Sequence, residues 1–348
     1  MSAMPEIEEE QIEPFVLKWG EVLGHEVQQR ELRRLLAEGR LPHALLFSGA
    51  DGIGKRLCGR LTAAAVLCEH PVEGEPCGTC ASCRALLAGG HPDYYELKPE
   101  LRGKGTRLIR IEAIRELTEL AARYPVLSDR RVLLIDEADC MNEAAANSLL
   151  KTLEEPPGQV TFILITGAGS ALLETIISRC MPLYFGMLAQ EELQALLERR
   201  QIPKAVAAEL AILSGGSPGR ALAIHASGGL ARRDEALELL KNIPGLSLAE
   251  VWHRAESMGD WERPMATEWL MYFSMLLRDL LLLCEDGASP LIYHQDRRAD
   301  LLAILPVFSE TRLFGMLACV RELQRRLTAN VNLRLQFEGF FLRLREIE

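Results

Sequence analysis

The sequence predicts an α/β protein in which a parallel sheet carries a phosphate-binding loop and is followed by an all-helical region. Three observations lead to this prediction. Short apolar runs at Ala44–Ser48, Val132–Ile135 and Val160–Ile165 have the length of strands buried on both faces of a parallel sheet. A glycine-rich stretch, Gly49–Arg56, joins the first run to a helical pattern. From Leu230 onward, leucines and tryptophans recur at helical spacing.

Composition excludes several classes of protein. The 348 residues allow two or three domains, and 48% hydrophobic with 25% charged residues indicate a soluble globular chain. A net charge of −10 argues against binding duplex DNA alone, because phosphate contacts need concentrated lysine and arginine. No apolar run approaches the roughly 18 residues that span a bilayer. The acidic N-terminus is unlike a signal peptide. We therefore expect a cytoplasmic protein with no membrane partner.

The loop Gly49–Arg56 predicts a nucleotide-phosphate site. Gly49, Gly52 and Gly54 allow the backbone N–H groups to face an anion at a helix N-terminus, and Lys55 would reach the β and γ phosphates. A glycine-rich turn without a ligand is the structural alternative. Arg56 stands where this pattern has Ser or Thr to give magnesium a hydroxyl, and a guanidinium cannot ligate a cation. The sequence leaves open whether ATP and magnesium bind here.

Two acids follow the second apolar run. Asp136 and Glu137 come directly after Ile135, at the carboxyl end of the predicted strand. One carboxylate can hold a magnesium shell while the next polarises a water. Asn142 is a good N-cap for a helix over Ala144–Leu153. The pair is therefore a candidate for catalysis.

Cysteine spacing predicts a metal site. The four candidate ligands are Cys68, Cys77, Cys80 and Cys83, and three of them follow one another at two-residue spacings. Four thiolates complete a tetrahedral zinc site and leave no position for water, so the zinc would be structural. Free surface thiols or a redox pair are the alternatives.

The chain resembles the clamp-loader branch of the AAA+ nucleotide-binding proteins. The resemblance is carried by SLLKTLEEPP at Ser148–Pro157, by LLETIISRC at Leu172–Cys180, and by the cysteine spacing inserted between loop and acids. It covers about Phe15 to Glu348 and is best to the delta-prime subunit family of the bacterial DNA polymerase III clamp loader.

This resemblance implies three domains. They are an AAA+ P-loop domain with a four-cysteine zinc insert over residues 1–186, a small helical lid over 187–229, and an all-α collar for oligomerisation over 230–348. Within the first domain, Asp93–Leu97 predicts a further strand, and Lys98–Gly105 predicts a polar loop before the next helix.

The resemblance also implies roles for three single residues. Arg179, in the Ser-Arg-Cys triplet, would be an arginine finger acting on a neighbouring subunit's ATP, rather than a cap on helix carbonyls. Thr166 would be sensor 1, or otherwise a strand-terminal Thr without a partner. Arg220 would be sensor 2 folding over the phosphates, or otherwise a surface arginine.

The function implied by the resemblance is that of a stator. The chain would join a pentameric ring with gamma/tau and delta subunits, and this ring would use ATP to load the sliding β clamp onto primed DNA. Its own ATPase is in doubt because of Arg56, so whether it is an enzyme in its own right stays open. The alternative is an ATP-hydrolysing motor subunit of the gamma/tau type, favoured by the intact Asp136–Glu137 pair.

Overall fold

A computed structural model describes residues 15–22, 24–102, 106–167, 172–327 and 332–347. The chain divides into two compact units. One comprises Met1–Leu196 with Gly216–Gly219, and the other comprises Leu197–Gly215 with Arg220–Glu348. The division into a lid at 187–229 and a collar at 230–348 stays a prediction.

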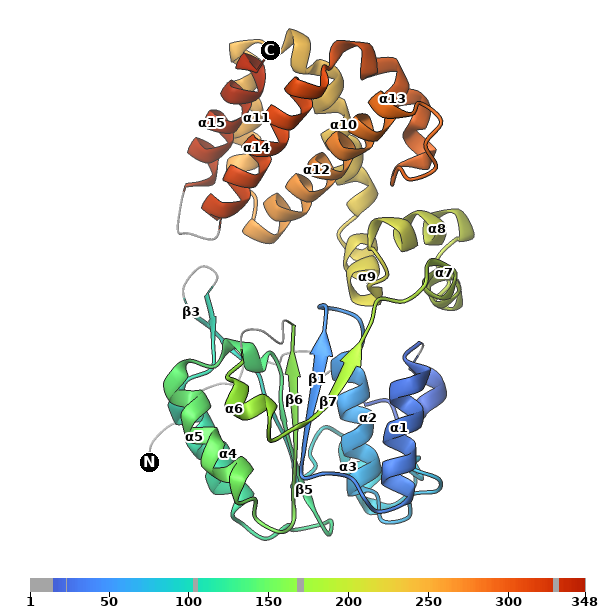
Figure 1. Ribbon diagram of the computed structural model, residues 1–348, viewed down its shortest axis with the longest axis vertical. Coiled ribbons are helices and arrows are strands. Elements are labelled where there is room, and N and C mark those ends of the chain that lie inside the picture. Colours follow the sequence, from blue (N-terminus) through green and yellow to red (C-terminus); the bar gives the residue numbers. More distant parts are fainter. Residues whose placement is uncertain (1–14, 23, 103–105, 168–171, 328–331, 348) are drawn as a thin grey trace. The chain divides into compact units, whose positions relative to one another are not determined.

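The first unit is built on a parallel sheet of five strands in the order β2-β5-β6-β1-β7 (Figure 1). The strands are β1 (Ala44–Gly49), β2 (Tyr94–Leu97), β5 (Arg131–Ile135), β6 (Val160–Thr166) and β7 (Met181–Phe185). Every residue of β5 and β6 is buried, as their continuous apolar character predicts. Because all strands run in one direction, the residues that follow β1, β5 and β6 meet at one edge of the sheet.

Helices cover both faces of this sheet (Figure 1). One face packs against α1 (Glu26–Ala37), α2 (Lys55–Leu67) and α3 (Ala81–Leu87), and the other against α4 (Ile111–Ala121), α5 (Glu143–Glu154) and α6 (Glu174–Ile177). Strand β1 shows the alternation, since Leu45 and Phe47 join the core under α2 while Leu46 joins the core under α5. The predicted α/β parallel-sheet fold is confirmed.

The predicted polar loop at Lys98–Gly105 is wrong in part, and residues 103–105 of that prediction lie outside the described residues. Strand β3 (Glu100–Arg102) pairs antiparallel with β4 (Thr106–Leu108), with Glu100 opposite Leu108. Charged residues have low strand propensity, so the local sequence does not reveal this antiparallel strand pair.

After β7 the described chain is helical. The helices are α7 (Gln190–Arg199), α8 (Lys204–Leu213), α9 (Pro218–Ala226), α10 (Gly229–Asn242), α11 (Leu248–Gly259), α12 (Arg263–Glu285), α13 (Arg298–Ile304), α14 (Glu310–Leu327) and α15 (Leu333–Glu346). Short 3-10 turns occur at Trp19–Glu21, Ala138–Cys140, Ile243–Gly245, Gln295–Arg297 and Leu305–Val307.

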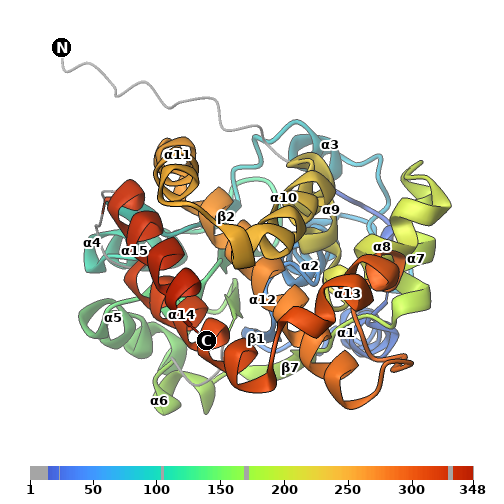
Figure 2. The same ribbon diagram turned by 90° about the horizontal axis from the view of Figure 1, so that it is seen from above.

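An aromatic core holds the second unit together. The ring of Trp269 stacks on Phe273 with centroids 5.1 Å apart and meets Phe337 and Phe341 edge-on. Helix α14 contacts both α12 and α15 (Figures 1 and 2). Between α14 and α15 lies a small cavity of about 50 Å³.

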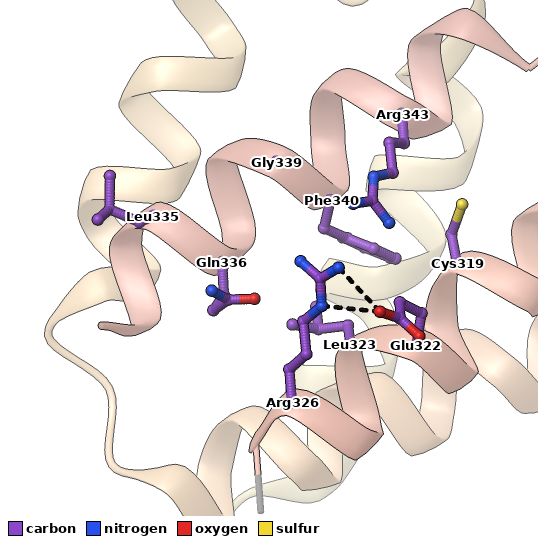
Figure 3. A pocket seen from close by; sticks show the side chains of 9 residues that line it. All are labelled: Cys319, Glu322, Leu323, Arg326, Leu335, Gln336, Gly339, Phe340 and Arg343. Carbon is purple, nitrogen blue, oxygen red and sulfur yellow. Dashed lines mark hydrogen bonds and ion pairs between the residues drawn. The ribbon is translucent and has the colours of Figure 1, made fainter. Parts of the chain in front are cut away.

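Figure 3 shows this cavity, with the ion pair between Arg326 and Glu322 and the side chain of Arg343 at its edge.

Among the described helices, none by itself has the length and apolar character to cross a bilayer, although the bent pair Gln295–Val307 and Glu310–Leu327 meets that test of length and composition.

Candidate functional site

The phosphate-binding loop lies at the sheet edge where its ligands are expected. It leaves β1 at Gly49, runs through Gly52 and ends at Gly54, which is the N-cap of α2. Lys55 and Arg56 are the first two residues of that helix. The backbone therefore has the strand–loop–helix geometry that binds an anion at a helix N-terminus.

Lys55 is turned onto the loop itself. The residue is 5% exposed, and Nζ donates hydrogen bonds to the carbonyl oxygens of Gly49 at 2.7 Å and Ala50 at 2.6 Å. Burial lowers the pKa of the Lys55 ammonium, and the nearby Asp51 and Asp136 carboxylates oppose that shift. The lysine predicted to reach the phosphates thus satisfies loop carbonyls in this conformation.

Ser217 and the first residues of α9 lie against the same loop. Ser217 donates its hydroxyl to the Asp51 carbonyl oxygen at 3.0 Å, and the Gly219 N–H donates to the Gly52 carbonyl oxygen at 2.7 Å. A Cβ atom at position 219 would lie 2.9 Å from the Gly52 Cα, so the close approach requires glycine. Sequence reasoning missed Ser217 and Gly219, although GGSPG marks a turn.

Arg56 occupies the position where the loop pattern places a magnesium ligand. Its Nε donates to Glu96 Oε1 at 2.6 Å and lies 3.6 Å from Asp136 Oδ2. Glu96 also accepts from Arg60 Nε at 2.8 Å and from the Tyr94 hydroxyl at 2.7 Å. Burial opposes ionisation of Glu96, but the Tyr94 hydrogen bond and the two arginines hold its pKa below the ordinary value.

Both candidate catalytic acids are paired with arginines. Burial raises the pKa of Asp136, while Arg56 lowers it and the backbone N–H of Glu137 donates to Asp136 Oδ1 at 3.1 Å. Glu137 forms an ion pair with Arg107. Because cationic side chains hold the positions around both carboxylates, the residues present do not fit a magnesium ion. Sequence analysis named the two acids and Arg56 but missed Glu96, Arg60 and Arg107.

Thr166 ends β6 beside the loop. It is fully buried and lies in register with Ser48, the residue before Gly49. The next residue, Gly167, donates its N–H to Asp139 Oδ1 at 3.3 Å. The structure therefore brings Thr166, Asp136 and the loop to the same sheet edge, as their positions after parallel strands predict.

Arg179 has its hydrogen-bond partners outside this group. It follows α6, whose Ile176 joins the core on the sheet face opposite α2. Its Nη2 donates to Glu154 Oε1 at 2.5 Å, its Nη1 donates to the Thr175 carbonyl oxygen at 2.7 Å, and a third of the side chain is exposed. The guanidinium is thus held at the surface by its own helix and by α5. Arg220 belongs to the second unit, where it contacts the Met271 sulfur.

The four predicted metal ligands converge. All four Sγ atoms lie within 4.8 Å of one another, and those of Cys68 and Cys80 are 3.9 Å apart. Zinc–sulfur bonds of about 2.3 Å imply S···S separations of about 3.8 Å in a tetrahedron, so the thiols fit the geometry of zinc. Cys68 ends α2, while Cys80 caps α3 by accepting the Cys83 N–H at 3.4 Å.

Local hydrogen bonds favour a thiolate in this cluster. N–H groups of Thr79 and Cys80 lower the pKa of the Cys77 thiol to about 6, whereas burial raises the pKa of Cys68 and of Cys83. The cluster could hold a metal with four sulfur ligands, and such a sphere is closed to water.

Comparison with known proteins places the chain in a family. The family described as "DNA polymerase III, delta subunit" matches residues 24–189. The chain is similar to DNA polymerase III subunit delta' of Pseudomonas aeruginosa, with 37% identity over 65% of this chain and 70% of the relative. It is similar to subunit delta' of Bacillus subtilis, with 30% identity over 95% of this chain and 100% of the relative.

A tau subunit is also similar over a shorter stretch. DNA polymerase III subunit tau of Escherichia coli is 36% identical over 52% of this chain but only 27% of the relative. The Bacillus subtilis delta' match, in contrast, extends over the full relative. Together with the parallel sheet, the phosphate-binding loop and the four-cysteine cluster, these likenesses show that the chain belongs to the family of DNA polymerase III delta-prime subunits, within the clamp-loader AAA+ proteins.

Proposed function

We propose that this chain is the stator of its clamp loader, a subunit that does not hydrolyse ATP itself and supplies Arg179 to the ATP site of a neighbouring subunit. In this proposal the ring contains gamma/tau and delta subunits, opens the sliding β clamp, and places the clamp on primed DNA. The work takes place in the bacterial cytoplasm. ATP turnover of the ring then depends on this chain even though its own loop is inactive.

The observation that carries the proposal is the position of Arg56. Its guanidinium bonds to Glu96 at 2.6 Å and pairs with Asp136 at 3.6 Å, which places a fixed positive charge where hydrolysis needs a magnesium ion. Lys55 adds to this closure, because its ammonium bonds to carbonyl oxygens of its own loop. The phosphate-binding fold is therefore kept without a cation site.

Arg179 supports the second part of the proposal. A planar, permanently charged guanidinium can stabilise charge on the oxygens of a transferring phosphoryl group. Its side chain is one-third exposed, and it is oriented by Glu154 and by the Thr175 carbonyl group. Its hydrogen-bond partners are Glu154, Thr175 and Ser178, none of which belongs to the chain's own phosphate-binding loop, so in this proposal the finger acts on a nucleotide held by a neighbouring subunit.

The four-cysteine cluster has a structural role in this proposal. Cys68, Cys77, Cys80 and Cys83 would hold one zinc ion, which supplies a cross-link between the end of α2 and the start of α3. The backbone N–H groups that point at the sulfurs fix the ligand geometry and stabilise the thiolates.

The helical part supplies the contacts of the ring. Phe314 in α14 and Leu335 in α15 are each 62% exposed, and Leu335 lines the same cavity as Arg343. Exposed aromatic and aliphatic groups beside an arginine are typical of subunit interfaces. Primed DNA would be bound by the assembled ring, which agrees with a net charge of −10 for this chain.

A motor subunit of the gamma/tau type is the second candidate. It is favoured by Lys55, by the intact Asp136–Glu137 pair, and by the likeness to the tau subunit. In that case the ion pairs of Arg56 would have to break when magnesium and nucleotide bind.

A reconstituted ring distinguishes the two candidates. We expect Arg179→Ala in this chain to lower ATP turnover of the ring by about 10³, the scale that arginine fingers supply. Lys55→Ala should leave turnover within about twofold, because the loop of this chain does no chemistry. The matched control for loss of a surface charge is Arg130→Ala.

The opposite pattern would contradict the proposal. A large loss with Lys55→Ala and none with Arg179→Ala makes the chain a motor. Assembly of each variant into the ring is checked by light scattering, so that a loss of turnover cannot come from a missing subunit.

A further inference from the structure

A charged groove lies between helix α1 and the turn that joins Cys68 to Cys77. One face of α1 contributes Glu26, Arg30, Arg33 and Arg34, and the turn contributes Glu73. The cavity volume of the groove is about 440 Å³. We call it the α1 groove. Neither the phosphate-binding loop nor Arg179 is part of it.

The α1 groove is built by packing. The turn is a two-residue hairpin, in which Val72 and Glu75 exchange two N–H···O bonds of 2.9 Å, and Glu73 and Gly74 have positive φ values of 51° and 75°. A Cβ atom at Gly74 would lie 2.6 Å from the Arg33 carbonyl oxygen, so only glycine permits this contact. The buried Trp19 donates its indole N–H to the Gly74 carbonyl oxygen at 2.9 Å.

Two guanidinium groups in the α1 groove are available to a ligand. Arg34 forms an ion pair with Glu31 at 2.8 Å. Within the described part of the chain, neither Arg30 nor Arg33 forms an ion pair. They are three residues apart on one helix, so their side chains project from the same face about one turn apart. Unpaired guanidiniums in such a row can each bind a carboxylate or a phosphate.

The glutamates decide between these two ligands. Glu26 and Glu73 line the same α1 groove as the two arginines. A nucleic acid backbone has no cationic group to pair with a glutamate. Repulsion between its phosphates and both Glu26 and Glu73 would weaken its binding. A protein segment of mixed charge can place carboxylates on Arg30 and Arg33 and a basic side chain near each glutamate.

We propose that the α1 groove docks a segment of another protein, with two carboxylates one helical turn apart in its centre and basic residues at its ends. The four-cysteine turn supplies one wall, so the metal site would serve recognition by holding Gly74 and Glu73 against α1. The occupant is a partner outside this chain, identified by its charge pattern.

The test measures binding of a fluorescent peptide to the full-length, metal-loaded chain. The peptide carries two glutamates one helical turn apart and a lysine at each end, and a second peptide has glutamines in place of the glutamates. We expect Arg30→Ala with Arg33→Ala to weaken binding of the first peptide by about tenfold, because two charge-assisted contacts are lost. Arg40→Ala, an exposed arginine outside the α1 groove, is the matched control and should leave binding unchanged.

A second variant tests the wall. Gly74→Ala keeps both arginines but forces the turn away from α1, so it should also weaken binding by about tenfold. Equal binding of the glutamine peptide, or equal binding by all variants, would overturn the proposal. So would a single-stranded oligonucleotide that binds more tightly than the peptide and depends on Arg30 and Arg33.

The chain's own acidic segment is the remaining competitor. Residues 1–14 contain five glutamates, Glu6, Glu8, Glu9, Glu10 and Glu13, and no lysine or arginine. If the peptide binds only after these are replaced by glutamine, the segment occupies the α1 groove and the proposal of a separate partner is wrong. Unchanged binding supports the separate partner.

Discussion

Arg56 and Arg179 lie in two regions of the same α/β unit and are used in opposite ways. Arg56 donates a hydrogen bond to Glu96 and forms an ion pair with Asp136, so carboxylates of the same chain neutralise its charge. Arg179 is held by Glu154 at the surface, where its guanidinium remains one-third exposed. The comparison shows two uses of arginine in one fold, one in an internal ion-pair network and one at the surface, and the proposed function assigns phosphate chemistry to the second alone.

Loss of one ligand from the four-cysteine cluster, in the unit that holds Arg56, gives the largest expected effect, a loss of zinc affinity. Cys80→Ser removes one of the four sulfur ligands, the one that caps α3; another ligand, Cys68, ends α2, the helix that begins at Lys55. We expect about one zinc per wild-type chain and a loss of zinc affinity of more than about 100-fold in the variant. Chelator competition measures the affinity and metal analysis the stoichiometry. Cys319→Ser, outside the cluster, is the control. Wild-type protein without zinc would contradict the metal assignment.

Asp93 tests the strand that carries Glu96. This fully buried carboxylate accepts N–H bonds from Val126, Leu127 and Ser128 at 2.7, 2.7 and 3.0 Å and pairs with Arg131. Burial opposes its ionisation, but the hydrogen bonds and Arg131 hold its pKa below the ordinary value. Asp93→Asn should lower the free energy of unfolding at pH 7 by roughly 2 kcal/mol.

The pH dependence follows from the direction of this shift. A lowered folded-state pKa contributes stability above the ordinary aspartate pKa of about 3.9, and that stability is lost as the pH falls through the folded-state value. The difference in unfolding free energy between wild type and Asp93→Asn should therefore shrink from pH 7 to pH 3 in urea titrations. A difference that does not change with pH would show that the ionised state of Asp93 does not account for its contribution to stability. Asp129→Asn, an exposed neighbour, is the control.

Replacing Arg56 tests whether the phosphate-binding loop can bind magnesium and ATP once the guanidinium is removed. Arg56→Thr removes the charge that pairs with Asp136 and adds a hydroxyl where magnesium would need one. We expect magnesium-dependent ATP affinity to rise at least about tenfold over wild type in calorimetry, whereas Arg56→Lys should show no gain. Tight, magnesium-strengthened binding by the wild-type chain would instead favour the motor subunit.

Replacing Glu154, the ion-pair partner of Arg179, gives the smallest expected effect on ATP turnover. Glu154 orients Arg179 through a partly exposed ion pair, and such pairs contribute about 0–1 kcal/mol. Glu154→Gln in the reconstituted ring should therefore change ATP turnover by less than about fivefold. A loss as large as that of Arg179→Ala would mean that Arg179 cannot act without this ion pair and would contradict the small contribution expected here.

Local patterns in the sequence determined the strands of the sheet, the phosphate-binding loop and the four-cysteine cluster. Apolar runs of strand length and fixed spacings of Gly and Cys act over a few residues, so they are visible without knowing the fold. The same patterns predicted Asp136 and Thr166 at one sheet edge, where the structure places them. The roles of these residues, of Arg179 and of Arg220 stay predictions.

Tertiary structure alone decided which residues contact the phosphate-binding loop and Arg56. Glu96 meets Arg56 across a separation of 40 residues, because β2 and α2 are brought together by the order of strands. Gly219 meets Gly52 and Trp19 meets Gly74 in the same way. Charged side chains at such distances have no periodicity to reveal them. Their pairing depends on which elements the folded core makes neighbours, so the sequence shows Arg56 at the magnesium position but not its ion pairs with Glu96 and Asp136.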